Sequence, residues 1–266
     1  MSLTLYYHPL ASYCWQPLIA LYENDTPFKP HIVDLMDPVS AAAFKKVWPV
    51  GKFPVLRDEA RGVTVPESTV IIEYLAQYYP GRTQLVPSEP DLSWRARLGD
   101  RFYDHYVNDP MSKIVTDRIR PAGRNDPHGV EEARTLLRTA LDMVQTEMAG
   151  RTWAVGEAFT IADCAAAPAL FYADKMMPLA ETHPHAAAYL GRLTQRPSFA
   201  RVLAEAEPYF KMFPECRTYP CAGAPKPGDP GPSHVIGKSR IAWMFASWSS
   251  SAHGFEFPLR PPMLQT

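Results

Sequence analysis

Hydrophobic residues in the first third of the chain fall into short runs that switch between strand and helix spacing. Residues 3–7 (Leu-Thr-Leu-Tyr-Tyr) form a β-prone run, a helix is predicted up to about Glu23, and residues 31–35 alternate like a strand. A strand, a helix and a second strand make a βαβ unit, so we expect these two strands to be parallel. Since proline is tolerated only in the first turn of a helix, Pro17 predicts that the helix begins near Cys14.

The next segment predicts two further strands and one helix. Residues 53–56 and 63–65 are short apolar runs, and the loop over 58–62 joins them as a hairpin. A helix is predicted from about Ser68 to Tyr78, where apolar residues recur at helical spacing. The order βαβ then ββα within residues 1–81 therefore predicts an α/β domain with one mixed sheet.

The second half of the chain has helical patterns alone. Residues 82–91 contain two prolines and no periodicity, so we interpret them as a linker. Residues 92–213 predict an all-α domain, a bundle of helices. The candidate helices span 92–119 (with Pro110 as a kink), 129–149, 160–174, 185–195 and 198–207. Proline and glycine recur over 214–266, and we interpret that segment as a tail whose composition favours disorder.

Composition narrows the classes of function. The 266 residues are 46% hydrophobic and carry a formal net charge of -1, which predicts a packed core and no nucleic-acid partner. No apolar run approaches the roughly 18 residues that span a bilayer, and no secretory signal opens the chain, so we expect a cytoplasmic protein without a membrane partner. The four cysteines are irregularly spaced and predict neither a disulfide framework nor a metal site.

Two short motifs carry candidate binding chemistry. If the bond before Pro54 were cis, the backbone N–H and C=O of Phe53 would face a ligand, which could add as a short strand; alone, the dipeptide is more typical of an ordinary trans proline. Glu67 and Ser68 stand where a helix begins. A helix N-terminus favours an anion and Glu67 a cation, a combination that suits an amino-acid headgroup; alone, the pair is more typical of a plain N-cap.

A third motif is structural. Thr160 and Asp163 have the spacing of a capping box, with Asp in place of the usual Glu. Phe159 and Cys164 are placed to form the accompanying hydrophobic staple. We assign this motif no catalytic role.

Together these features resemble the cytosolic glutathione S-transferase family, with a bacterial-type, serine- or cysteine-type first helix. The matching pieces are Leu5 to Pro9 with Ser12, Gly51 to Leu56, Glu67-Ser68 with Ile71 to Leu75, and Phe159 to Cys164. The resemblance covers residues 2 to about 213. It implies a thioredoxin-like, glutathione-binding first domain, glutathione as co-substrate without a metal, and a homodimer.

The resemblance also implies roles for individual residues. It implies a cis bond at Pro54, with the Phe53 backbone pairing with the cysteinyl part of glutathione. Glu67 and Ser68 would hold the γ-glutamyl group, and Lys52 would lie near the glycyl carboxylate. The implied activity is conjugation of glutathione to a small hydrophobic electrophile. The alternatives are a glutathione-dependent isomerase, a thiol-disulfide or peroxide reductase, and a non-catalytic protein that uses the same fold to bind a partner.

The residue that activates the thiol is open among several candidates. Ser12 is our first choice as the catalytic residue, because its hydroxyl can donate to the thiolate at the start of the first helix. Cys14 would suit mixed-disulfide chemistry, and Tyr6 or Tyr7 would suit the tyrosine-type classes. Candidates for the second-substrate pocket are Tyr13, Cys14, Tyr103, His105 (also a candidate general base), Tyr106 and Met111.

Overall fold

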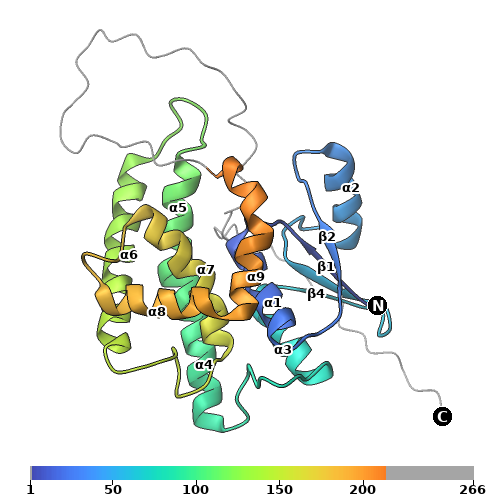
Figure 1. The fold of residues 1–266 in the computed structure, drawn as a ribbon. Helices are drawn as coiled ribbons and strands as arrows, with labels where there is room; N and C mark the ends of the chain where they lie inside the picture. Colours follow the sequence, from blue (N-terminus) through green and yellow to red (C-terminus); the bar gives the residue numbers. More distant parts are fainter. Residues whose placement is uncertain (1, 214–266) are drawn as a thin grey trace.

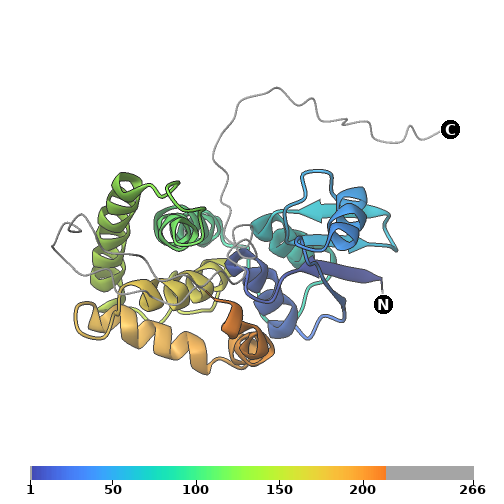
Figure 2. The ribbon, with the colours of Figure 1, turned by 90° about the horizontal axis from the view of Figure 1, so that it is seen from above.

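The computed structural model describes residues 2–213, and the predicted tail over 214–266 lies outside them. Figure 1 shows a small domain built on a sheet beside a larger domain of helices. Figure 2 shows helix α1 at the boundary between the two. Within residues 2–213, no helix is both apolar enough and long enough to cross a membrane.

The first domain has a thioredoxin-like mixed sheet, as expected. Its elements in chain order are β1 (Leu3–Tyr7), α1 (Ser12–Glu23), β2 (Lys29–Ile32), α2 (Pro38–Val47), β3 (Val55–Asp58), β4 (Val63–Pro66) and α3 (Ser68–Tyr78). The strand order is β2-β1-β3-β4. Strands β1 and β2 are parallel, as predicted, and β3 is antiparallel to both β1 and β4.

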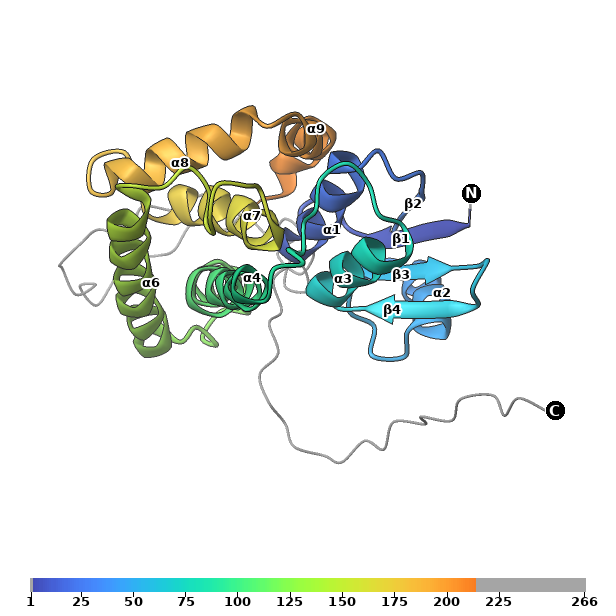
Figure 3. The same ribbon diagram turned by 90° about the horizontal axis from the view of Figure 1, so that it is seen from below.

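Both faces of the sheet are covered by helices. Helices α1 and α3 lie on one face, where Leu5 and Leu56 enter the main core (Figure 3). Helix α2 covers the other face through Phe44, which packs with Val33 and Val55. The sequence analysis missed α2, although Asp37 caps it and Pro38 takes its first position, a typical helix start.

The predicted start of the first helix was wrong. Helix α1 begins at Ser12, so Ser12 and Tyr13 belong to its first turn and Pro17 lies inside it. Proline at an interior position costs about 3 kcal/mol. Ten of the twelve α1 residues are buried, and this packing between the two domains offsets that cost. The second strand was also misplaced, since β2 covers Lys29–Ile32 rather than 31–35.

The second domain is all-helical, as expected. Its elements are α4 (Pro90–Phe102), a π-helical segment (Tyr103–Asn108), α5 (Asp109–Asp117), α6 (Pro127–Met148), α7 (Ile161–Met176), α8 (Pro184–Gln195), α9 (Pro197–Ala206) and a 3-10 turn (Glu207–Met212). The predicted helix over 92–119 is therefore interrupted by the π segment just before Pro110. The first residues of α4, Pro90 and Asp91, fall within the predicted linker.

Helix α7 is the centre of this domain. Its capping box is present: Thr160 caps the first turn, and the Asp163 side chain accepts from the Thr160 backbone N–H at 2.8 Å. Asp163 also accepts from the Ala154 N–H and the Tyr189 hydroxyl. Gly99 lets α4 approach α7 closely, because a Cβ at this position would lie 2.8 Å from the Cβ of Ala162.

The two domains share one hydrophobic core. Trp15 of α1 packs against Tyr172 of α7 with ring centroids 4.9 Å apart, and its indole N–H donates to the Pro9 carbonyl at 2.6 Å. The Tyr172 hydroxyl in turn donates to the Leu10 carbonyl. The turn between β1 and α1 is thus held by the second domain, which fixes the start of α1.

Candidate functional site

A cavity of about 470 Å³ is lined by both domains. Its residues are Tyr13, Trp48, Lys52, Phe53, Pro54, Pro66, Glu67, Ser68, Thr69, Val70, Arg101, Asp104, His105 and Asp109. All five residues expected to bind glutathione are among them. The structure therefore brings these five residues together, although they come from two separate segments of the first domain.

One part of the wall is the loop that leads into β3. The Phe53–Pro54 peptide bond is cis, as the resemblance implied. Lys52 is exposed beside it and has no ion pair with any residue of the described range. Phe53 is half-buried and stacks on His8 with ring centroids 6.1 Å apart.

The start of α3 forms the adjacent part of the wall. Glu67 occupies the N-cap position with φ of 69°, a left-handed conformation that is uncommon for a residue other than glycine. No side chain caps α3, so the plain N-cap interpretation of Glu67 and Ser68 is wrong. Ser68 is buried at the first helical position, and Glu67 is exposed. The first-turn N–H groups of α3 therefore remain available to an anion.

The opposite wall comes from the second domain, through Arg101 at the end of α4 and the π segment that follows. The Arg101 guanidinium donates at 2.8 Å to Asp100 and to Asp104, and it also contacts Thr69 of α3. Asp104 accepts from Gln16 of α1 at 2.6 Å. This network ties the two walls together.

The two aspartates of this network are fully buried. Burial raises the pKa of Asp100 to about 7, and the neighbouring Asp104 charge adds to the effect. Burial also raises the pKa of Asp104. Arg101 opposes both shifts because its charge favours the ionised carboxylates.

Asp109 joins two side chains that face the cavity. Its Oδ1 accepts from the Tyr13 hydroxyl at 2.8 Å. Its Oδ2 lies 3.2 Å from Nδ1 of His105, one helical turn earlier. A π-helical turn is frequent at functional sites, and here it carries Asp104 and His105.

The candidates for thiol activation have different surroundings. Ser12 is 1% exposed, is not among the cavity-lining residues, and its Oγ has no hydrogen-bond partner within the described range. Cys14 is fully buried, and burial raises the pKa of its thiol. Burial likewise raises the pKa of Tyr7 to about 12, and Tyr6 packs against His31 and Phe44.

The structure separates the six candidates for the second-substrate pocket. Tyr13 and His105 line the cavity. Cys14, Tyr103 and Met111 belong instead to the hydrophobic core, because α1, the π segment and α5 turn these positions inward. Tyr106 is half exposed and is not among the lining residues. The lining of this cavity therefore includes two of the six candidates and not the other four.

Sequence reasoning missed several cavity residues, namely Trp48, Thr69, Arg101, Asp104 and Asp109. For Arg101, Asp104 and Asp109 the signal was the cluster of charges between residues 100 and 109, inside an otherwise helical pattern. Charged groups that face a core must be paired, so such a cluster indicates either an ion-pair network or a site. Here it forms both.

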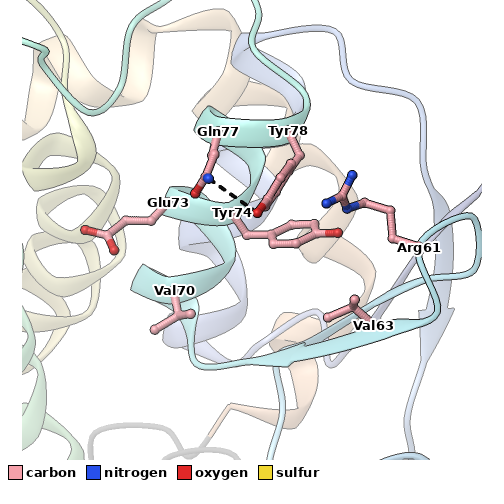
Figure 4. Close-up of a pocket in the computed structure, with 7 residues that line it drawn as sticks. All are labelled: Arg61, Val63, Val70, Glu73, Tyr74, Gln77 and Tyr78. Carbon is pink, nitrogen blue, oxygen red and sulfur yellow. Dashed lines mark hydrogen bonds between the residues drawn. The ribbon is translucent and has the colours of Figure 1, made fainter. Parts of the chain in front are cut away.

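A second hollow of about 370 Å³ lies on the outer face of β4 and α3 (Figure 4). The Arg61 guanidinium lies 3.9 Å from the centroid of the Tyr78 ring, and Val63 and Val70 are partly exposed beside it. Within residues 2–213, no group of three or more His, Cys, Asp or Glu side chains could hold a metal ion.

The fold defines a two-domain protein with a thioredoxin-like domain, a helical domain and a polar cavity lined by both. Residues 5–83 match the glutathione S-transferase N-terminal domain, and residues 127–192 match the glutathione S-transferase C-terminal domain. The two matches occur in the family's order and together cover more than half of the chain. This chain belongs to the glutathione S-transferase family.

Individual relatives agree with this assignment. The glutathione S-transferase-like protein LUC7 of Fusarium sp is 34% identical over 148 residues, which are 56% of this chain and 64% of that protein, so this alignment spans less than two thirds of the relative. A glutathione S-transferase structure from Methylobacillus flagellatus with glutathione bound is 25% identical, with a TM-score of 0.70 over 76% of this chain and 98% of its own. The stringent starvation protein A homolog of Coxiella burnetii is 29% identical over 77% of this chain and 93% of its own.

Proposed function

We propose that this protein is a glutathione transferase that joins the glutathione thiol to a small hydrophobic electrophile. The observation that carries this proposal is one wall of the 470 Å³ cavity. There the Phe53 backbone edge, the uncapped start of α3 and the Glu67 carboxylate lie together. These are the groups that an extended peptide with a free amino-acid end requires.

Each part of glutathione has a complementary group on this wall. The α-carboxylate of the γ-glutamyl residue suits the N-terminus of α3 with the Ser68 hydroxyl, and its ammonium group suits Glu67. The cysteinyl backbone suits the exposed N–H and C=O of Phe53, as a peptide adds to a sheet edge. Lys52 supplies a cation for the glycyl carboxylate. The solved relative with bound glutathione supports the same ligand.

The chemistry that follows is nucleophilic attack by the thiolate. An ordinary thiol has a pKa near 8.5, so activation at neutral pH requires a donor that stabilises the anion or a base that takes the proton. We keep Ser12 as the donor, since its buried hydroxyl has no other partner among the described residues. The buried Cys14 thiol argues against mixed-disulfide chemistry on Cys14, which would need an accessible thiol.

We also propose that two copies form a dimer through the outer face of α3 and α4. Val63, Val70 and Tyr78 are exposed around the hollow of Figure 4. On α4, Trp94 and Leu98 are 52% and 60% exposed. Apolar side chains that gather on one face are typical of an interface. Sedimentation of the purified chain should give twice the monomer mass. Trp94→Glu should lower the measured mass towards that of the monomer.

Titration with glutathione tests the proposed function. We expect saturable binding and turnover of a generic electrophile. Glu67→Gln and Ser68→Ala should each weaken glutathione binding by roughly tenfold or more, because each removes a hydrogen bond to a charged group. Glu157→Gln is the matched control, since Glu157 is exposed in a loop of the second domain. A folded protein that neither binds glutathione nor turns over would instead support the partner-binding alternative.

A further inference from the structure

The pair formed by His105 and Asp109 gives the cavity a proton acceptor of its own. We propose that Asp109 is a positioning residue that holds His105 as the general base for the glutathione thiol. This inference rests on the proposed function, because it needs glutathione in the cavity. It adds a second catalytic group to a site where the role proposed for Ser12 is that of a hydrogen-bond donor alone.

The geometry fixes which nitrogen of His105 is free. An ionised carboxylate only accepts hydrogen bonds, so Nδ1 must donate its proton to Oδ2 of Asp109, 3.2 Å away. Nε2 then carries the lone pair. Since His105 lines the cavity, this lone pair is available to a proton donor bound there.

Asp109 is itself held in place from the other domain. The Tyr13 hydroxyl donates to Oδ1 at 2.8 Å, so both carboxylate oxygens have a partner. Tyr13 lies in the first turn of α1, next to the proposed donor Ser12. A base held by a third group within hydrogen-bond reach is the arrangement expected of an activated nucleophile.

The other charged groups of this wall are paired with one another. Arg101 is a cation of the same wall, and Asp100 and Asp104 neutralise it at 2.8 Å. His105 is in turn one of the groups that lower the pKa of Asp104 against the effect of burial. Across the cavity, Lys52 and Glu67 offer one charge of each sign.

The proposed step conserves atoms and charge. The S–H bond of glutathione breaks, its proton moves to Nε2 of His105, and the electron pair stays on sulfur. The thiolate then forms a bond to the electrophilic carbon, and the leaving group departs with its own electron pair. The imidazolium returns its proton to the leaving group or to solvent, and the Asp109 carboxylate stabilises it meanwhile.

Proton counting by calorimetry in buffers of different ionisation enthalpy tests this step. At a pH slightly above neutral, glutathione binding to the wild-type chain should produce the ultraviolet absorbance of a thiolate with little proton release. A thiolate stabilised by a hydroxyl alone would release its proton to the buffer. S-methylglutathione, which has no thiol proton, gives the baseline for both measurements.

The decisive variant is His105→Gln. We expect glutathione affinity to stay within about threefold, the thiolate absorbance to disappear and kcat/KM to fall roughly 100-fold, the usual contribution of a general base. Asp109→Asn should lower the thiolate absorbance in the same way, with a smaller loss of kcat/KM. The matched control is His128→Gln, because His128 forms an equivalent i,i+4 pair with Glu132 on α6, outside the cavity.

The outcomes separate this inference from the proposed function. If the wild-type chain does not bind glutathione, the proposed function is wrong. If it binds, and His105→Gln keeps both its thiolate absorbance and its kcat/KM, then His105 is not the base. Proton release to the buffer on binding to the wild-type chain would overturn the inference in the same way.

Discussion

Tyr13 and Asp109 are 96 residues apart in the chain and are joined by a hydrogen bond of 2.8 Å. This contact links the first turn of α1 to the first turn of α5, and therefore one domain to the other. Together with the Gln16–Asp104 bond, this contact fixes the distance between the cavity wall of the first domain and the helical wall of the second. The cavity depends on this coupling, because neither domain forms it alone.

The first prediction concerns the role of Ser12. If its hydroxyl donates to the thiolate, Ser12→Ala should lower kcat/KM by roughly 10- to 100-fold, as expected for the loss of one hydrogen bond to a charged group. Glutathione affinity should change little, because the binding groups lie on α3 and the β3 loop. Steady-state kinetics with a generic electrophile would measure both values.

A matched control is available for this experiment. Ser112 is also buried, and its Oγ likewise has no hydrogen-bond partner among the described residues, but it lies on α5 and not at the start of α1. Ser112→Ala should keep wild-type kinetics. Equal activity of both serine variants would show that Ser12 is only a packed residue at the start of α1.

Local patterns of the sequence were enough to predict the order of the two domains and the positions of most helices. The capping box of α7 and the start of α3 at Ser68 were predicted from their own residues. The start of α1 was not, because the rule for Pro17 is local while the packing that overrides it comes from α7 and α9. Helix α2 was missed although Asp37 and Pro38 signalled it.

The candidate site also has one part that could be predicted from the sequence and one part that could not. The wall that we propose for glutathione could be predicted as a cluster because its residues lie in two compact motifs, Lys52 to Pro54 and Glu67-Ser68. The opposite wall could not, since the direction of each side chain depends on the π segment over Tyr103–Asn108. One extra residue per turn changes which side chains face inward. Tyr103 and Met111 therefore lie in the core, and His105 faces the cavity.

The second prediction concerns the ion pair that joins the domains far from the cavity. Glu23 at the end of α1 accepts from Nε and Nη2 of Arg196 at 2.9 and 2.5 Å. Ser198 and Thr83 donate to the same carboxylate. Because the pair is largely buried, removing one partner leaves the other charge uncompensated. Glu23→Gln should lower the free energy of unfolding by about 3 kcal/mol.

Urea denaturation would measure this loss, and an exposed pair provides the comparison. Glu147 and Arg151 form an i,i+4 pair at 3.2 Å on the surface, with both side chains about half exposed. Glu147→Gln should cost less than about 1 kcal/mol. A similar cost for both variants would show that burial adds nothing to the Glu23 pair.

The third prediction concerns the loss of stability in acid caused by His8. Burial lowers the pKa of His8 to about 4, and only the distant Asp34 charge opposes the shift. His8 packs between Phe53 and Tyr209, and its Nδ1 accepts from the Leu10 N–H at 3.2 Å. The folded state therefore holds this imidazole neutral.

The direction in which stability changes with pH follows from the pKa of His8 in the folded and in the unfolded chain. In the unfolded chain a histidine has a pKa of about 6.5, so between that value and pH 4 the unfolded state binds the proton more tightly. Stability is then lost as the pH falls through this window, by about 2 kcal/mol between pH 7.5 and 5. His8→Gln keeps an acceptor for Leu10 and cannot be protonated, so its free energy of unfolding should fall less over that range.

Urea denaturation at the two pH values would measure this difference. His31→Gln is the control, because His31 is exposed on β2 and should leave the wild-type pH dependence unchanged. Because other groups contribute equally to all three proteins, the difference between variants isolates His8. If His8→Gln lost as much stability in acid as the wild-type chain, protonation of His8 would not be the cause, and the imidazole would have to take up its proton without disturbing its contacts with Phe53 and Tyr209.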